Sequence, residues 1–277
     1  MIRFLLPQLR ARGAFIHAEN IVAEGTRIHG LTSSLATLFG QVLIGSMLLL
    51  SISKGGVRQV LQLDGTGGDG SGGRVQRLLA ESRQGAVRGY LTMVDQPRIM
   101  TDTANPGLHH WMGNTIQLST VRDLGFGTPY ISATQHHGDF LSDHLLHYLH
   151  QSVQVQAEII IHGNSGLLIE AMPGSNPEYW QQVLQASTAL HDAIFTDGDS
   201  TQLAQQFQPL GYRIVGQDPY HYRCNCNTEQ MVRALAAMAP LQLSELADES
   251  GQVTACCQYC GSSYSITPPP IFGSGTE

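Results

Sequence analysis

Lysine is nearly absent from this 277-residue chain, with Lys54 as its single example, and charged residues of all kinds make up only 13% of the sequence. The charges that are present are unevenly placed. Residues 1–174 hold twelve acidic and twelve basic side chains, whereas residues 175–277 hold ten acidic residues against three arginines. A C-terminal part that binds the phosphates of nucleic acid needs the opposite balance. We therefore expect no nucleic-acid partner.

The chain also lacks the pattern of an export signal. The opening MIRFLLPQLRARG has a short apolar patch, with Arg10 and Arg12 where a small-residue cleavage site would lie. The apolar run at 35–52 barely reaches the length of a membrane span, contains Gln41 and has no flanking aromatic anchors. We expect this run to be a buried helix of a soluble core, in a cytoplasmic protein with no membrane partner.

Cysteine is absent from the first 223 residues. All five cysteines lie in two short stretches, YRCNC at 222–226 and ACCQYCG at 255–261. In the reducing cytoplasm, clustered cysteines indicate metal or redox chemistry and argue against structural disulfides.

Hydrophobic periodicity predicts both strands and helices along the chain. Alternating patterns predict strands at 57–65, 75–82, 86–93, 115–123 and 130–135 and a hairpin over 155–174, and helical spacing predicts helices at 32–50, 138–152, 178–195, 200–212 and 228–241. Because helices and strands are not interleaved one for one, we expect an α+β fold. The glycine-rich stretch at 65–73 lacks the lysine of a phosphate-binding loop and is interpreted as a hairpin loop.

The stretch PGSNP at 173–177 is a strong break and marks a domain boundary. We expect an α+β N-terminal domain at 1–174, a helical linker at 175–221 and a small zinc-binding domain at 222–277. The helices of the linker are too short to fold alone and must pack on another part of the chain. Thr228 is expected to cap the helix of the last part.

The spacing of four cysteines is typical of a zinc site. Cys257-x-x-Cys260, followed by Gly261, brings two sulfurs to one metal, and Cys224-x-Cys226 supplies a second close pair. A domain of about 55 residues is near the size at which a hydrophobic core alone becomes marginal, so a metal often supplements it. The sequence predicts one zinc ion per chain. Cys256 is left over and is expected to be a small half-buried side chain.

The same cysteines suggest a redox switch. Zinc holds its sulfurs as thiolates, which are the form that oxidants attack. After oxidation, the neighbours Cys224–Cys226 and Cys257–Cys260 can form local disulfides and can no longer hold the metal. Without the metal the small domain should unfold.

Several segments resemble a known family in order along almost the whole chain. They are RGAFIHAENI, LLLSISKGGVRQVLQLDG, GAVRGY, GDFLSDHLLHYLHQS, GLLIEAMPGS, and finally CNC followed by CQYCG. Together they resemble heat-shock protein 33, a family of redox-regulated bacterial holdase chaperones.

The resemblance implies a non-enzymatic chaperone that binds unfolding client proteins without ATP. It implies that Cys224, Cys226, Cys257 and Cys260 hold zinc in an inactive reduced form. Oxidation by peroxide with heat, or by hypochlorite, then forms disulfides within the pairs, releases zinc, unfolds the linker and C-terminal domain, and yields a client-binding protein, commonly a homodimer.

This chain departs from the family pattern in three places. Its linker is rich in glutamine and poor in charge, GTGGDGS at 65–71 lengthens a loop, and Cys256 lies beside a ligand pair, where it could form an off-pathway disulfide.

Two other classes of function stay open. A zinc-ribbon nucleic-acid binder is disfavoured by three arginines against six acidic residues in 213–277. A thiol oxidoreductase using Cys257 and Cys260 needs an electropositive setting, and no lysine lies nearby.

Histidines 144, 147 and 150 recur every three residues, but on a helix at most two of them face one metal. We expect them to form a solvated helix face.

Overall fold

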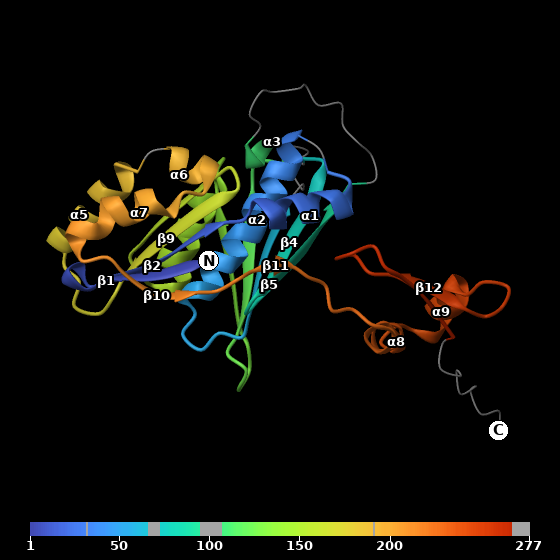
Figure 1. Cartoon of the computed structure of the whole chain (residues 1–277). Coiled ribbons are helices and arrows are strands. Elements are labelled where there is room, and N and C mark those ends of the chain that lie inside the picture. The colour runs from blue at the N-terminus through green and yellow to red at the C-terminus, as the bar shows by residue number, and fades with distance from the viewer. Residues whose placement is uncertain (32, 66–72, 95–106, 191, 268–277) are drawn as a thin grey trace. The chain divides into compact units, whose positions relative to one another are not determined.

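The computed structural model describes residues 1–31, 33–65, 73–94, 107–190 and 192–267 (Figure 1). The predicted loop at 65–73 therefore lies almost wholly outside the described residues. Contacts within the chain divide it into two compact units, Met1–Tyr222 and Arg223–Glu277.

The first unit contains an antiparallel sheet, here called sheet A, with strand order β10-β1-β2-β9-β8. Its strands are β1 (Ile2–Leu6), β2 (Ala11–His17), β8 (Ala157–His162), β9 (Ser165–Ala171) and β10 (Arg213–Gln217). The predicted hairpin is confirmed as β8 and β9. Sequence analysis did not predict β10, which pairs with the first strand of the chain.

A second sheet, sheet B, has the order β11-β5-β4-β3-β6-β7. Its strands are β3 (Arg58–Gly65), β4 (Val75–Arg83), β5 (Ala86–Met93), β6 (Ile116–Asp123), β7 (Tyr130–His136) and the two-residue β11 (His221–Tyr222). All neighbours pair antiparallel except β11, which runs parallel to β5. Each of the five longer strands falls where alternating hydrophobicity predicted one.

Helix α2 (Ser33–Ile52) is the hydrophobic centre of the first unit. It contacts β2 and β9 of sheet A as well as β3 and β4 of sheet B, and Figure 1 shows it between the two sheets. Phe39, Leu43 and Met47 on this helix are fully buried. The segment Ser34–Ile52 is long and apolar enough to cross a membrane, but 72% of its most apolar window is buried inside the protein. The predicted buried helix is confirmed.

Smaller helices complete the core around α2. They are α1 (Glu19–His29), α3 (Leu108–Met112) and α4 (Leu141–Tyr148), which continues as a π-helical turn at Leu149–Val153. Leu141, Leu145 and Leu149 are buried in the same cluster as α2.

The opposite face of sheet A is covered by the helices that follow PGSNP. These are α5 (Pro177–Thr188), α6 (Asp192–Asp197) and α7 (Ser200–Phe207), with short 3-10 turns at Pro7–Leu9 and Gln208–Leu210. Trp180, Val183 and Phe207 pack with Phe4 of β1 in a second buried cluster. The division into 1–174, 175–221 and 222–277 stays a prediction; the structure assigns these helices to its first unit.

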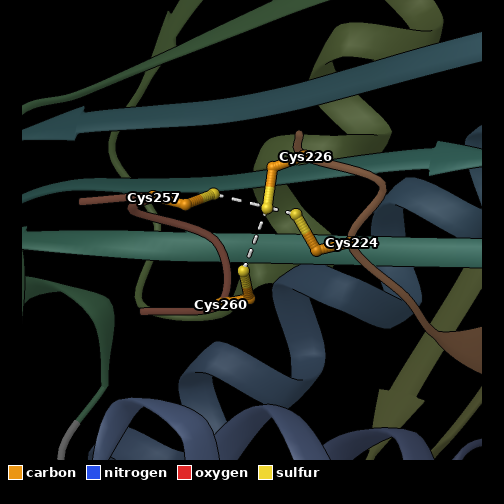
Figure 2. Close-up of side chains that lie close together, drawn as sticks. All are labelled: Cys224, Cys226, Cys257 and Cys260. Atoms are coloured by element: carbon orange, nitrogen blue, oxygen red, sulfur yellow. Dashed lines mark hydrogen bonds between the residues drawn. The ribbon is translucent and has the colours of Figure 1, made fainter. Parts of the chain in front are cut away.

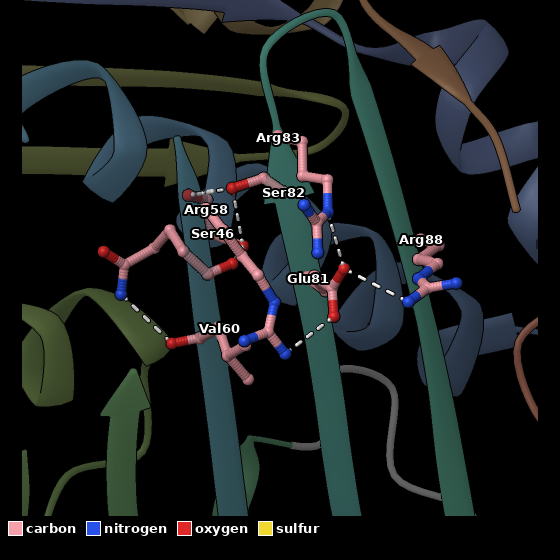
Figure 3. A network of polar contacts seen from close by, with 8 residues as sticks. Ser46, Arg58, Val60, Glu81, Ser82, Arg83 and Arg88 are labelled. Atoms are coloured by element: carbon pink, nitrogen blue, oxygen red, sulfur yellow. Dashed lines mark hydrogen bonds and ion pairs between the residues drawn. The ribbon is translucent and has the colours of Figure 1, made fainter. Parts of the chain in front are cut away.

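One buried carboxylate in sheet B is surrounded by arginines (Figure 3). The Glu81 side chain is 3% exposed and accepts hydrogen bonds from Arg58 at 3.0 Å and from Arg83 and Arg88 at 3.1 Å each. Burial acts to raise the pKa of Glu81, but the three guanidinium groups outweigh it and hold the pKa below its usual value. Glu81 is therefore an ionised anchor between β3, β4 and β5.

Candidate metal centre

The described part of the second unit, residues 223–267, has little hydrophobic interior. Its elements are α8 (Thr228–Ala236), α9 (Pro240–Leu246) and the hairpin of β12 (Val253–Cys256) with β13 (Ser263–Ile266). The buried apolar residues of its core are Leu235, Leu243, Val253 and Ile266. So small a cluster stabilises a fold of this size weakly.

The turn between β12 and β13 presents two of the thiols. The backbone N–H groups of Cys260 and Gly261 both donate to the Cys257 carbonyl, at 3.3 and 2.8 Å, and the Cys257 N–H donates to the Ser262 carbonyl at 2.9 Å. Gly261 has a φ of +71°, a left-handed conformation that costs glycine little. This tight turn holds Cys257 and Cys260 on the same side of the hairpin.

The other two thiols lie on the extended segment that leads into α8. The helix begins directly after Asn227, whose side chain accepts a hydrogen bond from the Gln230 N–H at 2.9 Å. The prediction that Thr228 caps this helix is wrong by one residue, because Asn227 has the extended backbone that a cap requires. The cap fixes the chain immediately after Cys226.

The four sulfurs converge, although the two pairs come from distant parts of the sequence (Figure 2). Their Sγ atoms all lie within 4.8 Å of one another. Cys224 Sγ is 3.7 Å from Cys257 Sγ, and Cys226 Sγ is 3.3 Å from Cys260 Sγ. A tetrahedral zinc with Zn–S bonds of about 2.3 Å places its sulfurs about 3.8 Å apart. The donor type and spacing therefore fit zinc, and the group could hold a metal ion.

The thiols of this group differ in acidity. Burial raises the pKa of Cys257 to about 12 and also raises the pKa of Cys226. At Cys260 burial acts in the same direction, but hydrogen bonds with Ser262 and the neighbouring thiols outweigh it and lower the pKa to about 7. Without a cation, the raised pKa values keep the sulfurs of Cys226 and Cys257 protonated at neutral pH. A bound divalent cation would favour thiolates throughout.

Tyr264 on β13 is a partner of the thiol group that sequence analysis missed. Its hydroxyl donates to the Cys226 carbonyl at 3.1 Å and lies 3.1 Å from the Cys226 Sγ. The hydrogen bond with the Cys226 sulfur raises the pKa of Tyr264 to about 12. The alternation in SYSI places the Tyr264 side chain on the opposite face of the strand from Ser263 and Ser265. No sequence pattern indicates which thiol it contacts.

Cys256 lies outside the group of four. Its side chain is exposed, and its Sγ contacts the Gly261 carbonyl at 3.4 Å. The predicted half-buried position is wrong because side chains alternate along β12: Val253 and Ala255 face inward, so Cys256 points to the exposed face.

The predicted solvated face of histidines is wrong for His144. This side chain is fully buried, with Nε2 2.9 Å from the Gly138 carbonyl, because its position on α4 faces the core. His136 meets it edge-on and stacks on His147, whereas His150 is exposed.

Comparison with known families adds to this geometry. The family described as "Hsp33 protein" matches residues 1–267. The chain belongs to the Hsp33 family.

Relatives of this Hsp33 family member are similar over nearly their whole length. The "33 kDa chaperonin" of Latilactobacillus sakei is 24% identical, with 94% of this chain and 92% of the relative covered. The "33 kDa chaperonin" of Deinococcus radiodurans is 26% identical, with 92% and 91% covered. The crystal structure of the 33 kDa chaperonin (heat shock protein 33 homologue) of Thermotoga maritima matches with a TM-score of 0.71 at 19% identity, covering 93% and 90% of the two chains. The mixed α/β fold is thus that of an Hsp33 structure.

Proposed function

We propose that this protein is a redox-regulated, ATP-independent holdase chaperone of the cytoplasm, and not an enzyme. In its resting form Cys224, Cys226, Cys257 and Cys260 are reduced and hold one zinc ion per chain. When bound, zinc supplies a tetrahedral link between the two cysteine segments, with binding free energy on the order of 10 kcal/mol. Membership of the Hsp33 family and the names of its relatives support the chaperone part of the proposal.

Oxidation acts on the two pairs of neighbours. The zinc-bound thiolates of Cys224 with Cys226, and of Cys257 with Cys260, each form one S–S bond and lose two electrons per bond, and the two protons that peroxide reduction needs come from solvent. One hydrogen peroxide per bond accepts the electrons and protons and is reduced to two waters. A disulfide sulfur is no longer a thiolate, so these residues can no longer hold the metal.

Without the zinc ion, the second unit has too little hydrophobic core to stay folded. Four buried apolar residues are too few to hold α8, α9 and the hairpin together. We propose that this unit and the linker helices then unfold, that the apolar surface so exposed binds unfolding client proteins, and that the oxidised form is a homodimer.

The observation that carries the proposal is the convergence of four sulfurs within 4.8 Å in a unit with so small a core. The test is zinc content and circular dichroism before and after peroxide at elevated temperature, with aggregation of a denatured client assayed in parallel. Oxidation should release one zinc per chain, reduce helix content and suppress client aggregation. Equal protection by the reduced, zinc-loaded protein would refute the switch.

A further inference from the structure

A cavity of about 250 Å³ lies in the first unit, where the C-terminal end of α2 meets one end of each sheet. None of its lining residues is a cysteine, and the four clustered cysteines belong to the second unit. Its charged and polar lining residues are Arg12, Ser53, Lys54, Gln59, Arg122 and Glu170.

The strand register explains why these polar side chains share one cavity. Gln59 of β3 is directly opposite Arg122 of β6, and Arg122 is directly opposite Tyr130 of β7. Directly opposite residues project from the same face of a sheet, so all three side chains point to one side. In sheet A, Arg12 and Glu170 are opposite one another in the same way.

The cavity has a surplus of positive charge. Three cationic side chains, Arg12, Lys54 and Arg122, line it together with one carboxylate, Glu170. Glu170 is already paired with Arg12, which also donates to the Ile52 carbonyl at the end of α2 at 2.9 Å. Within the described residues, neither Lys54 nor Arg122 has an acidic partner within 4.0 Å. The part of the chain that the structure describes therefore offers these two positive charges no counter-charge.

Two buried donors at this cavity lack a hydrogen-bond acceptor. Ser53 is 8% exposed, and its Oγ has no hydrogen-bond partner among the described residues. The same holds for the Nε of Arg122, whose guanidinium lies over the Tyr130 ring at 5.0 Å. A buried donor without an acceptor is costly, and a charged one more so, unless something else occupies the site. An anion in the cavity would accept from both groups.

The remaining lining is apolar and aromatic. Of these lining residues, Leu49 and Tyr148 are buried, whereas Tyr130 is exposed. Such a mixture of apolar walls with a few convergent polar groups is typical of small-molecule sites. An inorganic ion alone would make no apolar contact with these lining residues.

We propose that this cavity binds a small organic oxyanion, a phosphate or carboxylate group carried on an apolar or aromatic body. Arg122, Lys54 and Ser53 bind the charged oxygens, and Arg122 is suited to this because its planar guanidinium matches two oxygens at once. Leu49, Tyr148 and the adjacent apolar residues contact the body. The site does not depend on the cysteines or on the proposed chaperone activity.

Phenyl phosphate is a suitable probe, titrated calorimetrically into the reduced, zinc-loaded, full-length protein. Inorganic phosphate at matched ionic strength tests the contribution of the body, and phenol tests the contribution of the charge. Phenyl phosphate should bind at one site per chain, at least about fivefold more tightly than either comparison compound.

Variants locate the site. Lys54→Gln and Arg122→Gln should each weaken phenyl phosphate binding about tenfold or more. Arg27→Gln removes an exposed arginine of α1 that is paired with Glu24, and should leave binding unchanged. Because Lys54 is exposed, its variant should fold normally even if Arg122→Gln does not, which circular dichroism checks.

Two results would overturn the proposal. One is no saturable binding of phenyl phosphate beyond that of phenol. The other is binding that Lys54→Gln leaves intact or that Arg27→Gln weakens equally, since either shows that the anion binds elsewhere. Neither result bears on the zinc-dependent switch, whose readouts are metal release and client protection.

Discussion

Cys226 and Cys260 have sulfurs 3.3 Å apart although they lie 34 positions apart in the chain, and Cys224 and Cys257, 33 positions apart, have sulfurs 3.7 Å apart. These contacts join one cysteine segment to the other. Disulfide bonds within the pairs Cys224–Cys226 and Cys257–Cys260 would leave the two segments unconnected. Disulfide bonds between the two pairs would keep the segments connected. The proposed activation therefore requires disulfides within the pairs and not across them.

Disulfide mapping distinguishes these outcomes. After peroxide treatment at elevated temperature, mass spectrometry of proteolytic peptides should find Cys224–Cys226 and Cys257–Cys260 linked. The proposed unfolding allows the pairs to separate, and neighbours in sequence then meet most often because short loops close at the least entropic cost. Predominant Cys224–Cys257 or Cys226–Cys260 bonds would mean a closed, stapled unit and would contradict the proposed activation.

Removal of one thiol should abolish metal binding. Cys257→Ser replaces a buried member of the group with a hard, protonated oxygen, so zinc content should fall from one per chain to nearly none, and α8 and the hairpin should lose their structure. Metal analysis and circular dichroism measure both effects.

Cys256→Ser is the matched control, because it changes the neighbouring cysteine outside the group of four. It should keep one zinc per chain. Equal zinc loss in the two variants would show that Cys256 is a ligand.

The hydroxyl of Tyr264 should strengthen metal binding without touching the metal. Tyr264→Phe keeps the ring but removes the hydrogen bonds to the carbonyl and sulfur of Cys226. Loss of a partner that orients a ligand weakens zinc affinity about 10–100-fold. Competition with a chromogenic chelator measures the change. Thr254→Val, at an exposed position on β12, should have no effect, and an unchanged affinity in Tyr264→Phe would exclude the positioning role.

Glu81 should make the first unit more stable at neutral than at acid pH. Its folded-state pKa is lowered, so its stabilising effect is present above its unfolded pKa of about 4.3 and is lost as the pH falls through the folded value. Glu81→Gln leaves three arginines without a carboxylate partner. It should lower the free energy of unfolding by roughly 2–3 kcal/mol at pH 7, because water can solvate the half-exposed Arg83 but not the mostly buried Arg88.

Urea unfolding followed by tryptophan emission measures this difference, because both tryptophans, Trp111 and Trp180, lie in the first unit. The difference in free energy of unfolding between wild type and Glu81→Gln should decrease from pH 7 toward pH 3. A difference that is independent of pH would show that the loss is one of packing and not of charge.

Trp180 reports whether the linker helices detach on oxidation. It is 6% exposed and packs in the cluster between α5 and sheet A. In a Trp111→Phe background, the remaining emission should shift to longer wavelength when peroxide releases zinc, because Trp180 becomes hydrated. Zinc release without an emission shift would restrict unfolding to the second unit. Chelation of zinc under reducing conditions is the comparison that separates metal loss from disulfide formation.

Local patterns in the sequence predicted much of this protein. The long strands of sheet B, the hairpin of β8 and β9 and the buried α2 all follow from periodicity and apolar length, which are properties of neighbouring residues. The spacing within Cys224–Cys226 and within Cys257–Cys260 likewise indicated two close pairs of potential metal ligands, because the reach of a tight turn depends on few residues. These features depend on contacts close in the sequence.

Tertiary structure decided the rest. The pairing of β10 with β1, reinforced by an Arg3–Asp218 ion pair at 2.8 Å, joins residues 215 apart and has no local signature. The burial of His144, the contact between Tyr264 and Cys226 and the cationic cavity at the end of α2 depend equally on how distant elements pack. Sequence periodicity specifies which face of an element is apolar, but the partner of that face is set by the packing of the whole chain.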